Sequence, residues 1–175
     1  MKNLLLISLS LLFFSCGKKV SRPPVQELIT EQLKNSHSNS EWFVSFNQAV
    51  KGLNVDQANW KDSTENHSIS QLSSHLLFWN KRILKAFKRE NVEEFEGENT
   101  ETFALLDSVA WEKTKEDLDQ VMIEMEEAVA NATSEQLEGW TTSLANVASH
   151  NAYHTGQILY IRKMKGWWDS SQGVQ

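Results

Sequence analysis

From residue 25 onward, apolar side chains recur every three to four residues, the spacing that gives an α-helix one apolar face. No sustained stretch alternates apolar and polar residues with the period of two that is typical of a half-buried β-strand. The whole chain has only two prolines, Pro23 and Pro24, and seven glycines, which leaves room for few tight turns. The pattern therefore predicts an all-α domain built from long amphipathic helices.

Four helices are predicted, and local signals mark several of their boundaries. Ser68 and Gln71 form a capping box that begins the second helix, and Gly166 ends the last one. The first helix is expected to break at residues 35–40, whose short polar side chains compete for backbone hydrogen bonds. One helical turn is expected near residues 55–58, in the connection that follows. In chain order the predicted helices cover residues 25–53, 68–89, 108–131 and 141–165.

The apolar faces of these helices predict the core. Tryptophans at helix positions or helix ends are expected to anchor it, because they bury large apolar surfaces; they are Trp60, Trp79, Trp111 and Trp140. The face of the first predicted helix consists of Leu28, Ile29, Leu33, Trp42, Phe46, Ala49, Val50 and Leu53.

The connection between the second and third helices, residues 91–107, is acidic and longer than the roughly 2–8 residues usual between bundle helices. A segment of that length can run the height of the bundle. The second and third helices can therefore be parallel neighbours joined by a crossover rather than a hairpin. Four amphipathic helices of these lengths predict a four-helix bundle.

The first sixteen residues have the features of an export signal. Lys2 precedes an almost wholly apolar run, residues 4–14, which is too short for the roughly 20 apolar residues of a membrane span. Ser15 and Cys16 follow directly after this run. The whole segment resembles a bacterial lipoprotein signal, in which cleavage before the cysteine leaves a lipid-modified cysteine as the new N-terminus. The segment departs from that pattern at residue 13, which is Phe13 here and is usually a leucine in such signals. The alternative is an ordinary secretory signal with a cysteine there by chance.

These features divide the chain into four predicted parts. A signal peptide covers residues 1–15, a tether residues 16–24, the helical domain residues 25–168 and a C-terminal tail residues 169–175. The predicted location is that of an exported lipoprotein, on the periplasmic side or the cell surface. Its membrane contact is the lipid on Cys16.

Composition excludes several classes of function. Cys16 is the only cysteine, so the domain has no thiol for a disulfide, a thiolate ligand or a nucleophile. The formal net charge of −6 argues against nucleic acid, whose phosphates require basic patches. The remaining partners are a small-molecule substrate of unknown kind and, as an open alternative, a second copy of the chain in a homodimer.

Three of the five histidines are placed to bind a metal ion. His150 and His154 are four residues apart, so they project from one helix face and can bind one cation. Their stripe is otherwise apolar, as is that of His75, so all three face the core, where a divalent metal would satisfy them. Each could instead be a core histidine bonded to a backbone carbonyl. His37 is expected to be solvated and His67 to pack in a loop at the bundle end.

The sequence around these histidines adds a family resemblance. The run from His150 through Ile158, followed by Arg162 and Gly166, and the block around His75 are similar to the DinB-like (damage-inducible protein) superfamily. Further matching positions are Trp42, residues 49–53, residues 56–60, residues 67–69, Trp79 and Trp111.

The resemblance covers residues 25–168 and implies both a topology and a site. The implied fold is a four-helix bundle of up-down-down-up topology. The implied site holds a divalent metal on three histidines, here His75, His150 and His154. Zn²⁺ is the expected ion, with Ni, Fe and Mn as alternatives.

Residues that flank the ligands are given structural or positioning roles. Gly156 is expected to let a neighbouring helix approach closely. Gln157 is expected to orient a ligand or a bound water, whereas Asn151 is interpreted as an ordinary polar helix residue. Tyr153 is expected to point away from the ligand stripe and to pack.

Three neutral imidazoles leave one coordination position open, as in catalytic zinc sites, where the metal lowers the pKa of its water. Asn151 stands where an HExxH motif has its glutamate, so no general base is identified and the catalytic residues stay unknown. The resemblance implies a metal-dependent hydrolase or a metal-dependent thiol transferase. An exported protein meets few small thiols, which favours hydrolysis. The alternatives are a non-catalytic lipoprotein that binds metal or a small ligand, and a bundle with vestigial histidines that acts through protein interaction.

Overall fold

The computed structural model describes residues 24–174, and the regular elements in that part of the chain are all helical. The prediction of an all-α fold is confirmed. None of the helices in the described range is long and apolar enough to cross a bilayer. The helices are α1 (Val25–His37), α2 (Phe46–Val50), α3 (Val55–Asn59), α4 (Ile69–Phe87), η1 (Asn99–Thr102), α5 (Ser108–Ala130), α6 (Ser134–Glu138), α7 (Thr141–Met164) and η2 (Ser170–Gln172).

The three longest helices, α4, α5 and α7, lie where the apolar periodicity predicted them. The predicted capping box is present at the start of α4. The Gln71 amide donates to Ser68 Oγ at 3.3 Å, and the Ser68 amide donates to Gln71 Oε1 at 3.0 Å. Gly166 follows α7 with a φ of +67°, a left-handed conformation that glycine adopts without steric cost.

The first predicted helix is divided, as the polar break suggested, but its apolar face was only partly right. α1 ends at His37, and the chain does not resume helical structure until α2. Trp42 lies between them and is 92% exposed, so its assignment to the core was wrong. Trp42 was assigned to the apolar face by continuing the helical spacing of α1, and that spacing no longer applies after α1 ends at His37. Leu28 is also exposed, because α1 packs through Ile29 and Leu33 instead.

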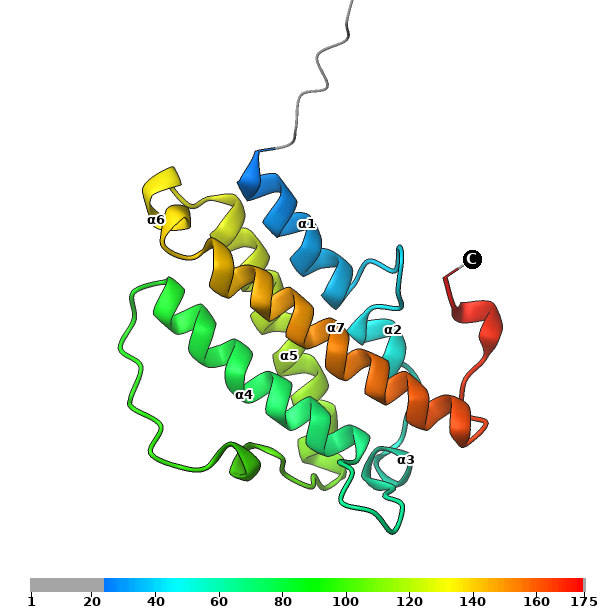
Figure 1. The fold of residues 1–175 in the computed structure, drawn as a ribbon. Helices are drawn as coiled ribbons and strands as arrows, with labels where there is room; N and C mark the ends of the chain where they lie inside the picture. The colour runs from blue at the N-terminus through cyan, green and yellow to red at the C-terminus, as the bar shows by residue number, and fades with distance from the viewer. Residues whose placement is uncertain (1–23, 175) are drawn as a thin grey trace, which may run out of the picture.

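α4 and α5 lie side by side and run in the same direction (Figure 1). Two ion pairs show the shared direction, because both join residues with the same offset along the chain: Lys81 with Asp117 and Lys88 with Glu124. The connection between the two helices therefore returns along the length of the domain. α7 runs opposite to α4, since Trp140 before α7 contacts Phe87 at the end of α4.

The core lies between α1, α4, α5 and α7, and Trp111 is one of its largest fully buried side chains. Its indole Nε1 donates to the Leu53 carbonyl at 3.0 Å, which fixes the start of α5 against the turn after α2. Trp60 and Trp140 are half-buried and pack at the edge of the core, so they are less buried anchors than Trp111. The core is thus closed by aromatic side chains at its ends.

His37, which was expected to be solvated, is buried with an exposure of 2%. Its Nδ1 lies 2.7 Å from Glu126 Oε1 and its Nε2 lies 2.8 Å from Asp119 Oδ1, both on α5. Burial alone would lower the pKa of His37, but the two carboxylates outweigh burial and raise it. The imidazole therefore joins the end of α1 to α5 as a cation between two acids. The expectation failed because both counter-charges come from a distant part of the chain.

Candidate metal centre

The structure brings His75 of α4 together with His150 and His154 of α7. The Nε2 atom of His150 lies 3.1 Å from that of His75 and 3.0 Å from that of His154. His75 and His154 are buried, and His150 is half-buried at the edge of the group. Within residues 24–174 this is the one group of three His, Cys, Asp or Glu side chains close enough to share an ion.

The outer nitrogens of two of these rings have partners that fix where the proton sits. Thr102 Oγ1 donates its hydrogen to the Asn99 carbonyl at 2.7 Å, so it must accept from His75 Nδ1 at 2.6 Å. Gln157 Oε1 can only accept, so His154 Nδ1 donates to it at 2.6 Å. Both imidazoles therefore carry their proton on Nδ1. Each turns a bare Nε2 lone pair toward the centre of the group.

This arrangement leaves more acceptors than donors at the centre. His150 Nε2 has at most one hydrogen when neutral, so it can serve only one of the two lone pairs that face it. The other lone pair lacks a donor, which is costly in a buried place. A divalent cation accepts from all three nitrogens at once, and the outer hydrogen bonds are those that orient histidine ligands. The chemistry of the donor set therefore fits a metal ion.

The charge states of the three rings also suit metal binding. Burial lowers the pKa of His75 to about 4, with the neighbouring imidazoles adding to the effect. Burial and His154 lower the pKa of His150 to about 4. The pKa of His154 is lowered too, mainly by burial and against the hydrogen bond to Gln157. All three are neutral at pH 7, the form that binds a metal without first releasing a proton.

Phe103 supports the group from the crossover between α4 and α5. Its ring stacks on His75 with centroids 4.0 Å apart and on His67 with centroids 3.7 Å apart. His67 is thus a packing residue, as expected, although it lies one ring away from a candidate ligand. Sequence reasoning missed Thr102 and Phe103, because the crossover has no periodicity to mark inward-facing residues.

The predictions for the flanking residues had mixed outcomes. Gln157 orients His154, as expected. Asn151 is 2% exposed and accepts a hydrogen bond from Asn80 Nδ2 at 3.0 Å, so it is a buried link between α7 and α4 rather than an ordinary helix residue. Gly156 allows no close helix approach, since a Cβ built there meets nothing within 4 Å. Tyr153 points outward and is 64% exposed.

An open cavity of about 420 Å³ reaches the group from the side of His75 and His150. We call it the triad cavity. Its lining is uncharged, since the two histidines are neutral at pH 7 and no carboxylate, ammonium or guanidinium group contributes to it. The lining residues are His75, Trp79, Asn80, Ile83, Asn99, Ser143, Asn146, Val147 and His150.

Comparison with known families decides what kind of chain carries this site. The sequence model of the DinB superfamily matches residues 44–158, a span that contains all three histidines. The chain belongs to the DinB superfamily. Comparison with curated proteins and with solved structures found no match in either case.

Proteins of the DinB superfamily bind divalent metals, which agrees with the donor set described above. In this DinB-superfamily chain, His75, His150 and His154 could hold such an ion. The identity of the ion and its binding to these residues stay predictions.

Proposed function

We propose that this chain is a metal-dependent hydrolase that uses a water activated by a divalent ion on His75, His150 and His154. The observation that carries the proposal is the surplus of bare Nε2 lone pairs at the centre of the triad, beside an open cavity. The ion, for which Zn²⁺ is our first choice and Ni, Fe or Mn the alternatives, would lower the pKa of a water and polarise a carbonyl. The bundle that carries the site is, in this proposal, of the up-down-down-up type, which the shared direction of α4 and α5 supports.

The lining of the triad cavity points to an uncharged substrate. A charged group that lies in this cavity away from the ion would lose water without gaining an opposite charge from the protein, which is costly. Asn99, Asn146 and Ser143 offer amide and hydroxyl groups that can hydrogen-bond a neutral ester or amide. Trp79 offers a flat apolar surface, and its indole Nε1 is held by Asn99 Oδ1 at 3.2 Å.

The protein's own groups prepare the site before substrate enters. Thr102 and Gln157 keep protons on the outer nitrogens of His75 and His154 and so keep the inner nitrogens free. Phe103 covers one face of His75 and keeps water from that side. These side chains supply orientation and exclusion of water, and they take no part as acid or base.

Turnover of uncharged substrates tests the proposal. Purified protein loaded with Zn²⁺ is expected to hydrolyse members of a panel of neutral nitrophenyl esters and anilides, and to lose activity with a chelator. Added Zn²⁺ should restore it in the native protein but not in His154→Ala. A nitrophenyl ester whose acyl chain carries a carboxylate should be a poorer substrate than its neutral counterpart, because the protein lining away from the ion offers that carboxylate no opposite charge. An absence of turnover across the neutral panel, with metal bound, would contradict hydrolysis.

One observation favours a non-catalytic alternative. No Asp or Glu lines the triad cavity, so a conventional carboxylate base is missing from it. The alternative is a lipoprotein that binds metal or a small neutral ligand without reaction. It predicts metal content of one ion per chain together with no turnover, which is the outcome that contradicts hydrolysis above.

We further propose that residues 1–15 are removed and that Cys16 carries the lipid that holds the domain at a membrane. The support is the apolar run of residues 4–14 ending near the sole cysteine. Both lie outside the described residues. Mass spectrometry of membrane-fraction protein is expected to find an acylated N-terminus at Cys16, and Cys16→Ser should release the protein or leave it unprocessed. Intact Met1 on protein recovered from the cytosol would overturn this part.

A further inference from the structure

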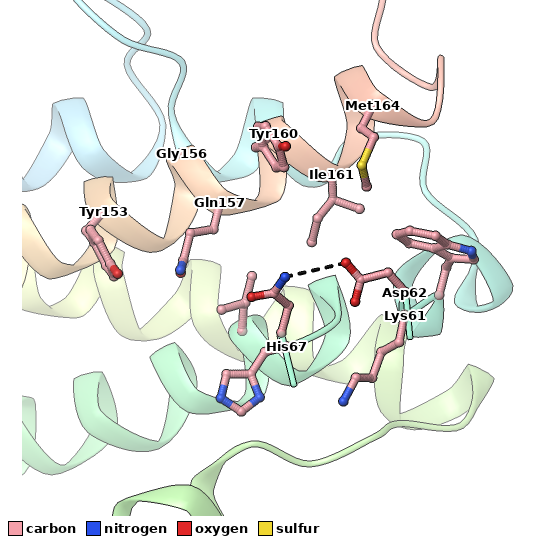
Figure 2. A pocket seen from close by; sticks show the side chains of 12 residues that line it. Lys61, Asp62, His67, Tyr153, Gly156, Gln157, Tyr160, Ile161 and Met164 are labelled. Atoms are coloured by element: carbon pink, nitrogen blue, oxygen red, sulfur yellow. Dashed lines mark hydrogen bonds between the residues drawn. The ribbon is translucent and has the colours of Figure 1, made fainter. Parts of the chain in front are cut away.

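A second cavity, of about 310 Å³, lies between the outer face of α7 and the segment that joins α3 to α4 (Figure 2). It shares no lining residue with the triad cavity, and none of the three histidines lines it. Gln157 marks the boundary, because its Oε1 holds His154 while its side chain lines this second space. We call it the tyrosine cavity, after Tyr153 and Tyr160.

The walls of the tyrosine cavity are mostly aromatic and aliphatic. Trp60 forms a fixed wall, because Trp167 packs edge-on against it with centroids 6.3 Å apart and Lys165 Nζ lies 4.4 Å from its ring centre. Tyr153 and Tyr160 remain 64% and 69% exposed although they flank an apolar space. The apolar lining consists of Trp60, Leu72, Tyr153, Tyr160, Ile161 and Met164.

Gly156 lies between the two tyrosines on α7 and leaves the space over the helix vacant. A Cβ built at this position meets no heavy atom within 4 Å. A larger side chain there would extend into the tyrosine cavity rather than into the core. The absence of a side chain at residue 156 is thus what keeps this cavity open.

The polar groups at the cavity have unequal freedom to bind a ligand. Asp62 is occupied by its own loop: Oδ1 accepts from the Thr64 amide at 2.9 Å, and Oδ2 accepts from Asn66 Nδ2 at 3.4 Å, a bond drawn in Figure 2. Lys61 is exposed and has no carboxylate partner within 4.0 Å among residues 24–174. Burial, followed by Lys61, lowers the pKa of His67, so that ring is neutral at pH 7. The one cation left to pair with a ligand at this cavity is Lys61.

We propose that the tyrosine cavity binds a small organic acid with a ring-bearing apolar body. The body packs against Trp60 and the tyrosines over Gly156, and the acid group pairs with Lys61. The volume is at the lower end of the range of about 300–1,000 Å³ found for small-molecule sites, so the ligand is compact. This inference does not rest on the hydrolase proposal, because it concerns residues that do not touch the triad cavity.

Two fluorescent probes that differ only in their acid group test the proposal. Anilinonaphthalene sulfonate carries the acid, and phenylnaphthylamine is its uncharged analogue. Both are expected to bind the folded protein at one site per chain. Gly156→Leu should abolish binding of both by filling the cavity, and Ser149→Leu, two turns earlier on α7 and outside both cavities, should leave it unchanged. Binding of the sulfonate that survives Gly156→Leu would overturn the proposal.

The charge part of the proposal has its own variant. Lys61→Gln is expected to weaken binding of the sulfonate by roughly two- to fivefold, which is the effect of losing one solvent-accessible ion pair. The affinity for the neutral probe should stay unchanged. Lys163→Gln, on α7 but outside both cavities, should change the binding of neither probe. An equal loss for both probes in Lys61→Gln would overturn the choice of an acid. Metal content is measured in parallel and should stay that of the native protein in Gly156→Leu, which separates failure here from failure of the metal site.

Discussion

Replacing His150 with alanine is expected to remove the metal from the protein while the helices stay in place. The variant lacks one of the three inner nitrogens, so the metal affinity should fall by more than the roughly 10- to 100-fold that loss of an outer hydrogen-bond partner costs. His150 is half-buried beside an open cavity, so water can fill the space it leaves. The free energy of unfolding should drop by about 0.5–3 kcal/mol, as for ordinary substitutions. Elemental analysis, circular dichroism and thermal melts measure these quantities.

A substitution outside the three histidines should weaken metal binding by less than His150→Ala does. Thr102→Val keeps the shape of the side chain but removes the oxygen that accepts from His75 Nδ1. It should lower metal affinity by about 10- to 100-fold without changing the number of ions per chain. Thr114→Val is the matched control, since Thr114 is a buried threonine of α5 outside the triad.

Metal content that is indifferent to His150→Ala would show that the site is wrongly assigned. An apoprotein that does not melt cooperatively would make the metal structural and weaken the hydrolase proposal.

Replacing His37 with methionine is expected to destabilise the protein by about 3–5 kcal/mol, because it leaves Glu126 buried without its counter-charge. Glu126 is only 9% exposed, so water cannot take the place of the imidazole. The loss of His37 destabilises Asp119 less than Glu126, because Asn47 still donates a hydrogen bond to Asp119 and the Asp119 side chain is 43% exposed. The double variant His37→Met with Glu126→Leu should recover most of the loss, because an apolar pair often replaces a buried ion pair at little cost. Denaturant unfolding measures both, and a double variant as unstable as the single one would contradict the explanation.

The same network should respond to pH in a defined direction. The pKa of His37 is raised above 6.5, so its stabilising effect is complete below pH 6.5 and is lost as the pH rises through the raised value. Burial raises the pKa of Asp119, but the hydrogen bonds from Asn47 and His37 outweigh burial and lower it from 3.8. The stabilisation that Asp119 contributes is therefore lost as the pH falls through the lowered value. The stability gap between native protein and His37→Met should therefore be widest between these limits. A gap that grows as the pH rises above neutrality would contradict this assignment.

Much of the fold followed from local patterns. The Ser68 capping box and the apolar stripes of α4 and α7 were enough to place those helices and to predict that three histidines face one core. Because a helical face depends only on residue spacing, His75, His150 and His154 could be grouped before any contact was known.

The errors have separate physical causes. His37 lies in a polar stretch, and nothing nearby in the sequence shows that two carboxylates of α5 neutralise it in the core. Trp42 fits an apolar stripe that ends when the helix breaks at His37. Gly156 was given a packing role because a helical glycine often permits close approach, whereas here the space above it is empty. Only the error at His37 was decided by residues far away in the sequence, whereas the error at Trp42 follows from the nearby end of α1.

The parallel course of α4 and α5 changes how the crossover between them can vary. Surface connections usually tolerate insertions and deletions, because little depends on their length. Here the returning segment passes the triad, and η1 together with Phe103 delivers the Thr102 hydroxyl and a stacking ring to His75. A deletion in residues 99–103 would shift both partners of His75 at once. In evolutionary terms this stretch of the crossover should keep its length as strictly as the helices do, although it lies in a loop.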